Sequence, residues 1–173
     1  LMSSMISSGN ELLYDLPYPK IRFLTYLSQT EKYLFHGSNN LDISQFEPRE
    51  QTLYNSKLTK AVFAASEPVW SCFYAVLDRS KRIGGFRNGC LVTPKKKYHY
   101  YSITHETYQN NPWVEGMVYI LPREHFKKSG QSKVQFDEWV SHDHVTPISK
   151  LRITIDDFPF RNKISKHKKN ESI

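Results

Sequence analysis

The chain has 173 residues, of which 39% are apolar and 14% aromatic, and this size and composition fit a single globular domain. No apolar run approaches the roughly 20 residues of a membrane helix, and we expect no signal peptide because the Ser-rich start lacks a basic and an apolar region. Two cysteines, Cys72 and Cys90, are too few for a disulfide framework, so we expect a reducing, cytoplasmic setting.

The net charge of +7 is concentrated at the C-terminal end. Residues 161–173 contain five lysines and arginines against one acidic residue, Glu171, which accounts for +4 of that charge. Such a composition predicts a solvated basic tail behind a domain of residues 1–160. A nucleic-acid contact through residues 161–169 is the functional alternative for this tail.

The first part of the chain predicts a helix, a strand and a long loop. The apolar spacing within residues 21–27 favours an amphipathic helix of about three turns that starts near Pro19. Residues 33–35 predict a short strand that ends in a turn at residues 36–38. The polar stretch 39–60 is expected to be a long loop, and long loops in compact domains are often functional.

A second helix is expected directly after a strand at residues 61–65. Ser66 is a suitable cap and Pro68 fits the first helical turn. The apolar face of this helix is expected to comprise Val69, Cys72, Phe73, Val76 and Leu77. Cys72 is therefore interpreted as a small core residue.

The rest of the chain predicts mainly strands, separated by turn signals such as Asn88-Gly89. The expected strands are residues 90–93, 98–104, 116–121, 134–140 and 151–155. Many strands combined with two early helices favour an α+β fold over a doubly wound α/β sheet.

Two short segments carry the strongest functional signal. In the first, an apolar strand leads into His36-Gly37-Ser38, and in the second Glu138 begins the run Glu138-Trp139-Val140. A glycine allows close approach of the backbone to a ligand, and a fixed carboxylate can stabilise positive charge that develops on a sugar.

These segments resemble the ADP-ribosyltransferase superfamily, in particular its His-Tyr-Glu branch, which includes poly(ADP-ribose) polymerases and diphtheria-type toxins. The resemblance implies that His36 bonds a ribose hydroxyl of NAD, that the Gly37 backbone pairs with the nicotinamide amide, and that Ser38 supports the ribose. It also implies that Glu138 stabilises the charge that develops as nicotinamide leaves. The implied architecture is two packed β-sheets around an NAD cleft, with a few flanking helices, and His36 and Glu138 facing each other in that cleft.

A third segment, Val62-Phe63-Ala64, resembles the Tyr-Phe-Ala element of the same family. Val62 stands where the family has its tyrosine, so the His-Tyr-Glu set is incomplete. Phe63 is the alternative stacking residue, although strand alternation would point its ring to the opposite face from Val62.

The helix that follows is implied to line the nicotinamide pocket with a small polar residue and an aromatic. Counting from Ala64 with one extra residue assigns these places to Ser71 and Tyr74, and counting without it assigns them to Trp70 and Phe73. The helical spacing of Phe73 favours a core position for that residue.

Two neighbours of Glu138 bear on its assignment. Asp137 is the alternative carboxylate. Relatives that modify arginine carry a glutamate two positions before the catalytic one, where this chain has Phe136, so arginine is disfavoured as the acceptor.

We expect no metal site. His142-Asp143-His144 lacks the further ligands of a zinc pattern and is interpreted as a polar loop, close enough to Glu138 in the chain to line the same pocket.

The resemblance implies an NAD-dependent mono-ADP-ribosyltransferase or NAD glycohydrolase that acts on a protein or nucleic-acid acceptor, without a membrane partner. One alternative is a non-catalytic relative that binds a nucleotide or a protein through the same cleft. Another is an enzyme directed to nucleic acid, with the basic tail as its contact.

Overall fold

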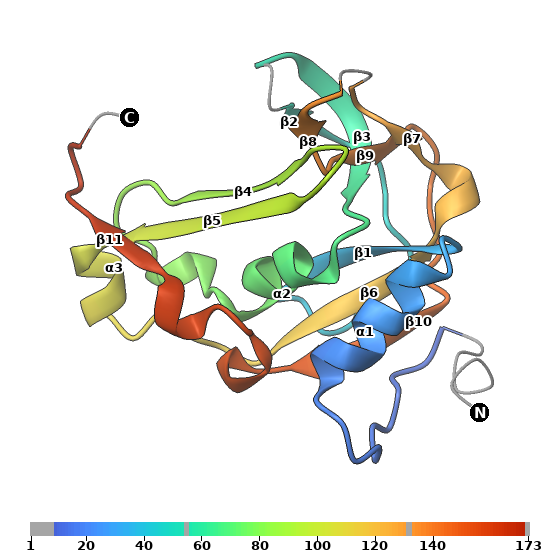
Figure 1. The fold of residues 1–173 in the computed structure, drawn as a ribbon, viewed down its shortest axis with the longest axis horizontal. Coiled ribbons are helices and arrows are strands. Elements are labelled where there is room, and N and C mark those ends of the chain that lie inside the picture. The colour runs from blue at the N-terminus through green and yellow to red at the C-terminus, as the bar shows by residue number, and fades with distance from the viewer. Residues whose placement is uncertain (1–8, 54–55, 131–132, 172–173) are drawn as a thin grey trace.

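The computed structural model describes residues 9–53, 56–130 and 133–171 and has an α+β fold (Figure 1). The described residues form three sheets, with the strand orders β1-β6-β10, β11-β5-β4-β8 and β2-β3-β9-β7. The helices are α1 (Lys20–Gln29), α2 (Pro68–Val76) and α3 (His105–Gln109). The strands are β1 (Tyr33–Ser38), β2 (Arg49–Thr52), β3 (Leu58–Ala64), β4 (Arg87–Val92), β5 (Lys97–Thr104), β6 (Gly116–Pro122), β7 (Lys127–Lys128), β8 (Gln135–Phe136), β9 (Trp139–Ser141), β10 (Ser149–Ile153) and β11 (Ser165–His167).

Strand β6 organises the core because it is buried on both faces. It pairs antiparallel with β1 on one side and with β10 on the other. Successive side chains of a strand point to opposite faces, so Val118 and Ile120 enter one hydrophobic cluster while Met117, Tyr119 and Leu121 enter another. This double burial explains the uninterrupted apolar run of the strand.

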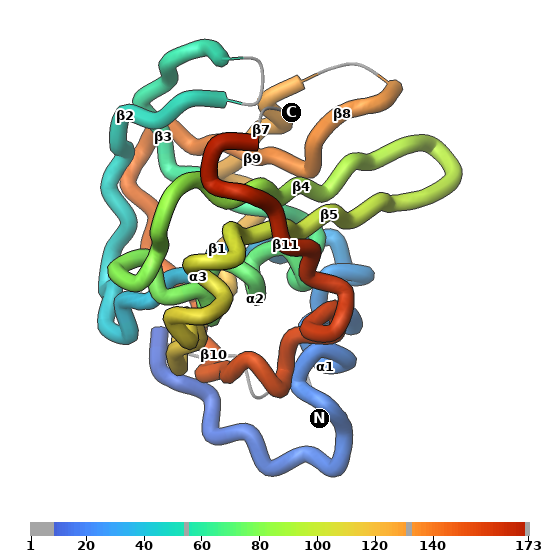
Figure 2. The backbone as a smooth tube through the Cα atoms, turned by 90° about the vertical axis from the view of Figure 1, so that its left-hand side faces the viewer, coloured from blue at the N-terminus to red at the C-terminus, as the bar shows by residue number. Residues whose placement is uncertain are grey.

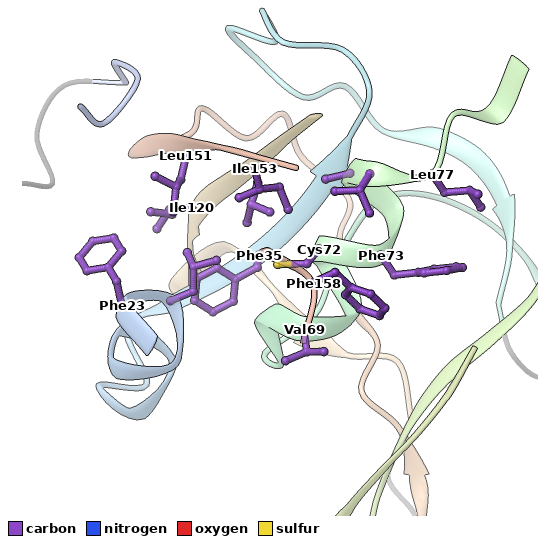
Figure 3. Packing of buried hydrophobic residues seen from close by; sticks show 14 of the residues in the cluster. Phe23, Phe35, Val69, Cys72, Phe73, Leu77, Ile120, Leu151, Ile153 and Phe158 are labelled. Carbon is purple, nitrogen blue, oxygen red and sulfur yellow. The ribbon is translucent and has the colours of Figure 1, made fainter. Parts of the chain in front are cut away.

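Helix α2 fills the space between two sheets. It packs against β1 and β6 on one side, and its Phe73 ring lies 4.8 Å from the ring of Tyr101 in β5 on the other. Figure 1 shows α2 between the β4–β5 hairpin and the β1-β6-β10 sheet. The close-up in Figure 3 shows Cys72 and Phe73 of α2 beside Phe35 and Phe158 in the main core.

Both predicted helices are present. Helix α1 begins at Lys20, directly after Pro19, and buries Phe23, Leu24 and Leu27 as its apolar spacing predicts. Helix α2 begins at Pro68, but its cap is Glu67, whose carboxylate accepts from the Val69 N–H. The hydroxyl of the expected cap, Ser66, donates instead to Asp137 at 2.6 Å.

Several strand boundaries differ from the prediction. Strand β1 continues through Ser38, so His36-Gly37-Ser38 is the end of the strand itself and not a turn after it. Residues 39–60 are not one loop, because β2 and the start of β3 pair within them. Asn88-Gly89 lies inside β4, where it pairs with β5.

The predicted strand 134–140 is interrupted at Asp137-Glu138. Strand β8 pairs with β4, whereas β9 pairs with β3, so the chain passes from one sheet to another at these two residues. The strand must be interrupted where the chain changes sheets, and the local sequence contains no signal for this interruption.

The basic tail is not a frayed end, in contrast to the expectation for residues 161–173. Strand β11 pairs in parallel with β5. Ile164 packs against the main core, and the buried His167 shares a 2.6 Å hydrogen bond between its Nδ1 and the Ser102 hydroxyl. The tail is ordered because Ile164 packs on the core and because β11 pairs with the free edge of β5, and neither contact could be predicted from the basic composition.

None of the helices in the described part of the chain is long and apolar enough to cross a membrane.

Candidate functional site

A cleft of about 680 Å³ opens where β1, β3 and α2 meet the link between β8 and β9. All seven residues that the sequence singles out as site candidates line this cleft, although they come from four separate segments. They are His36, Gly37, Ser38, Phe63, Ser71, Tyr74 and Glu138.

The imidazole of His36 is held by the backbone of β3. Its Nδ1 lies 2.6 Å from the Phe63 carbonyl oxygen, and its ring centroid lies 4.7 Å from that of Phe46. A carbonyl can only accept, so Nδ1 carries the proton and Nε2 is the acceptor in the neutral ring. Burial lowers the pKa of His36, and the charges of Arg79 and Arg49 lower it further. His36 is thus a neutral side chain with one lone pair available at the cleft.

Gly37 is needed for contact with α2. A Cβ atom at this position would lie 1.7 Å from the Ser71 carbonyl oxygen and 2.8 Å from the Ala75 nitrogen. The glycine therefore lets β1 and α2 pack backbone to backbone, a reason different from the close ligand approach that the sequence suggested. The next residue, Ser38, accepts from the Asn40 N–H at 3.1 Å.

Phe63 and Val62 face different surroundings. Val62 is 3% exposed and packs in the second core cluster together with Ala64. Phe63 is half-buried, lines the cleft and belongs to neither core cluster. Because successive side chains of β3 point to opposite faces, Val62 enters the core and Phe63 points to the cleft.

The helix α2 contributes Ser71, Tyr74 and Trp70 to the cleft, whereas Phe73 is fully buried in the main core. The Ser71 hydroxyl donates to the Phe35 carbonyl at 3.0 Å, so it joins the helix to β1. Tyr74 is half-buried, and its ring lies 6.4 Å from that of Trp70. Burial raises the pKa of Tyr74, so its hydroxyl keeps its proton.

The two adjacent carboxylates have different surroundings. Asp137 is 4% exposed and accepts from the Ser66 hydroxyl and the Glu67 N–H, both at 2.6 Å, and from the Trp139 indole at 3.2 Å. Glu138 is half-buried and lines the cleft, and its Oε1 accepts from the Ser129 hydroxyl at 2.9 Å. Asp137 is therefore structural, and Glu138 is the carboxylate that a ligand in the cleft can reach.

Sequence reasoning missed the cationic part of the cleft, Arg49 and Arg79. The Arg79 guanidinium lies 5.5 Å from the Tyr74 ring centroid, and its backbone N–H donates to the Asn39 side chain. The Asn39 amide also donates to the carbonyls of Ala75 and Leu77 at the end of α2. The sequence signal for this contact was Asn39, directly after His36-Gly37-Ser38, but an asparagine at that position is also typical of a solvent-exposed loop.

The loop His142-Asp143-His144 does not line this cleft, contrary to the expectation from its position in the chain. It borders a separate pocket of about 390 Å³ together with Glu47, Pro48 and Lys60. Within the described residues, no group of three or more His, Cys, Asp or Glu side chains is arranged to hold a metal ion.

No family model, curated protein or solved structure matches this chain.

Proposed function

We propose that this protein is an NAD-dependent mono-ADP-ribosyltransferase or NAD glycohydrolase that cleaves the bond between nicotinamide and ribose. The observation that carries the proposal is the convergence of all seven candidate residues, from four segments, on one cleft. The resemblance rests on short motifs that are far apart in the chain. If they form one NAD site, they must lie together in the fold, and residues at unrelated positions would rarely do so. The volume of about 680 Å³ is within the range of pockets that bind small molecules and cofactors.

The state of His36 suits the binding of a ribose hydroxyl. With its proton held on Nδ1 by the Phe63 carbonyl, the acceptor Nε2 can take a hydrogen bond from a hydroxyl donor. The lowered pKa keeps the ring neutral near pH 7, so this acceptor is preserved under ordinary conditions.

The position of Phe63 supports a simpler alignment with the family motif. If Phe63-Ala64-Ala65 is matched to Tyr-Phe-Ala in place of Val62-Phe63-Ala64, the count to Ser71 and Tyr74 needs no extra residue. Phe63 then takes the aromatic position, which agrees with its half-buried place in the cleft and with the burial of Val62 in the core. An aromatic face at this point can stack on the nicotinamide ring.

Glu138 is proposed to act in the transition state. When the bond between C1 of the ribose and the nicotinamide nitrogen breaks, its electron pair leaves with nicotinamide and positive charge develops on the ribose. A carboxylate beside the 2′-hydroxyl stabilises that charge, and the new bond at C1 forms with water or with an acceptor group. The same carboxylate can accept the proton that the attacking group releases.

Glu138→Gln tests this role, because glutamine keeps the shape and hydrogen-bonding capacity but removes the charge. We expect nicotinamide release from NAD to fall about 100- to 1000-fold, while calorimetry shows NAD affinity changed only slightly. The matched control is Glu124→Gln, because Glu124 has a side chain that is 81% exposed and does not line the cleft.

Retained turnover in Glu138→Gln would remove this residue from the mechanism. NAD binding without any nicotinamide release by the wild type would instead indicate a non-catalytic nucleotide-binding protein. Label transferred from NAD to protein or nucleic acid would distinguish a transferase from a glycohydrolase.

A further inference from the structure

The β11-β5-β4-β8 sheet has one face that does not pack on the core. Tyr101 and Ile103 of β5 point into the main core, so the alternate residues Tyr98 and Tyr100 point outward. They are 52% and 51% exposed. We call this outward side the tyrosine face; its residues are Gly89, Leu91, Tyr98, Tyr100 and Phe136.

Pairing across the strands joins three rings into one surface. Tyr98 pairs with Leu91, which pairs in turn with Phe136, and Tyr100 pairs with Gly89. The half-buried Phe136 ring lies over Gly89, since a Cβ at Gly89 would lie 2.8 Å from Phe136 Cε1. The glycine therefore makes room for the phenylalanine ring next to Tyr100.

The charge around the tyrosine face is positive. The four strands of the sheet contain no aspartate or glutamate, and Arg87 lies on the tyrosine face because it alternates with Gly89 and Leu91. Lys97 and Lys166 are on the opposite side of the sheet, where the Lys97 amine lies 3.2 Å from the Glu67 carboxylate. The β4–β5 turn adds the exposed Lys95 and Lys96. The Lys96 amine lies 5.2 Å from the Tyr98 ring centroid, so cation and ring form one continuous surface.

The turn that carries these lysines is well defined. The Thr93 hydroxyl donates to the Lys96 carbonyl at 2.9 Å and accepts from the Lys96 N–H at 3.0 Å. The resulting hairpin tip projects beyond the neighbouring strands (Figure 2). The lysines are therefore held at an accessible end of the hairpin.

We propose that the tyrosine face binds single-stranded nucleic acid, with bases stacked on Tyr98 and Tyr100 and phosphates beside Lys95 and Lys96. Aromatic rings beside lysines, with no carboxylate in the strands, match the combination that single strands require. Alternate residues of a strand are about 6.8 Å apart, twice the 3.4 Å rise between stacked bases, so each tyrosine can take a base from an extended strand. A duplex keeps its bases stacked inside and offers no such partner.

The face adjoins the cleft through β8. Phe136 is on the tyrosine face, and Glu138, two residues later, lines the cleft. A bound strand that runs past Phe136 thus comes near the carboxylate, which would make nucleic acid the acceptor if the proposed function holds. The binding itself depends only on the tyrosine face and is measured without NAD.

The test is fluorescence anisotropy of a labelled oligothymidylate of about 12 nucleotides with the whole chain, at about 50 mM salt. We expect a dissociation constant in the micromolar range and weaker binding to a duplex of the same length. Tyr98→Ala and Tyr100→Ala should each weaken binding about 5- to 150-fold, whereas Tyr98→Phe and Tyr100→Phe should retain it. Lys95→Ala and Lys96→Ala should each reduce the slope of log affinity against log salt by about 0.7.

The matched control is Tyr26→Ala, since Tyr26 is a 42% exposed tyrosine on α1, on the other side of α2 from the hairpin. It should bind like the wild type. No binding of the oligonucleotide at low salt would overturn the proposal, as would equal binding by the double variant Tyr98→Ala, Tyr100→Ala with an unchanged melting temperature. Binding to anionic phosphatidylserine vesicles without binding to the oligonucleotide would also overturn it.

Discussion

At the scale of single residues, Asp137 and Glu138 illustrate how position decides the role of a side chain. Both are carboxylates, and the sequence offers both as candidates. Asp137 is surrounded by three donors, from the start of α2 and from Trp139, and has no open side toward the cleft. Glu138 accepts from Ser129 at the cleft wall. The same chemical group is therefore structural at one position and available to a ligand at the next.

Asp137→Asn should lower the free energy of unfolding by about 2 kcal/mol, because the amide places an NH₂ donor where the carboxylate oxygens accept hydrogen bonds from three neutral donors. Urea unfolding measures the change. Glu138→Gln, which likewise replaces a carboxylate by its amide, should change the free energy of unfolding by less than about 0.5 kcal/mol. Equal stability of the two variants would show that the Asp137 contacts contribute little.

At the scale of elements, the contact between β1 and α2 sets the shape of the cleft. Helix α2 carries Ser71 and Tyr74 to the cleft, and β1 carries His36. The two elements approach closely because Gly37 has no side chain, and because the Ser71 hydroxyl and the Asn39 amide bond across the contact. The glycine of the motif is thus explained by packing within the protein.

Gly37→Ala should therefore destabilise the protein by about 3 kcal/mol or more, since the added Cβ would collide with the backbone of α2. Thermal or urea unfolding tests this. Gly85→Ala is the matched control, as an added Cβ there would meet nothing within 4 Å, and it should change stability by less than about 0.5 kcal/mol. A Gly37→Ala protein of normal stability would mean that β1 and α2 can separate at little cost.

At the scale of the whole molecule, the C-terminal segment completes the fold. Strand β11 pairs with the last three residues of β5, Ser102–Thr104, at the end of the β4–β5 hairpin opposite its tip (Figure 1). This segment places Ile164 on the main core and buries His167 against Ser102. The basic charge of the tail is therefore part of a folded surface.

Truncation after Phe160 should lower the free energy of unfolding by at least about 2 kcal/mol, because it removes β11 and the apolar contact of Ile164. In a domain of this size the melting temperature should fall by about 4–8 °C. Truncation after His167 retains β11 and serves as the control, with a change of less than about 2 °C. A melting temperature that is unaffected by the longer deletion would show that the edge strand is not needed.

The α+β class and both principal helices could be predicted from local spacing in the sequence, and short motifs suggested the seven candidate residues beside the alternatives Trp70, Phe73 and Asp137. Helix α1 follows from the apolar spacing of residues 21–27, and the start of α2 follows from Pro68. Which of these residues share a cleft depends on the tertiary structure, because they come from segments that are distant in the chain. The predicted strand 134–140 is broken because its first part, β8, pairs with β4, whereas its last part, β9, pairs with β3 in another sheet. The separate roles of Asp137 and Glu138, and of Phe63 and Val62, depend on partners distant in the chain. These features depend on which distant segments pair, and the residue pattern within one short strand does not specify its partner.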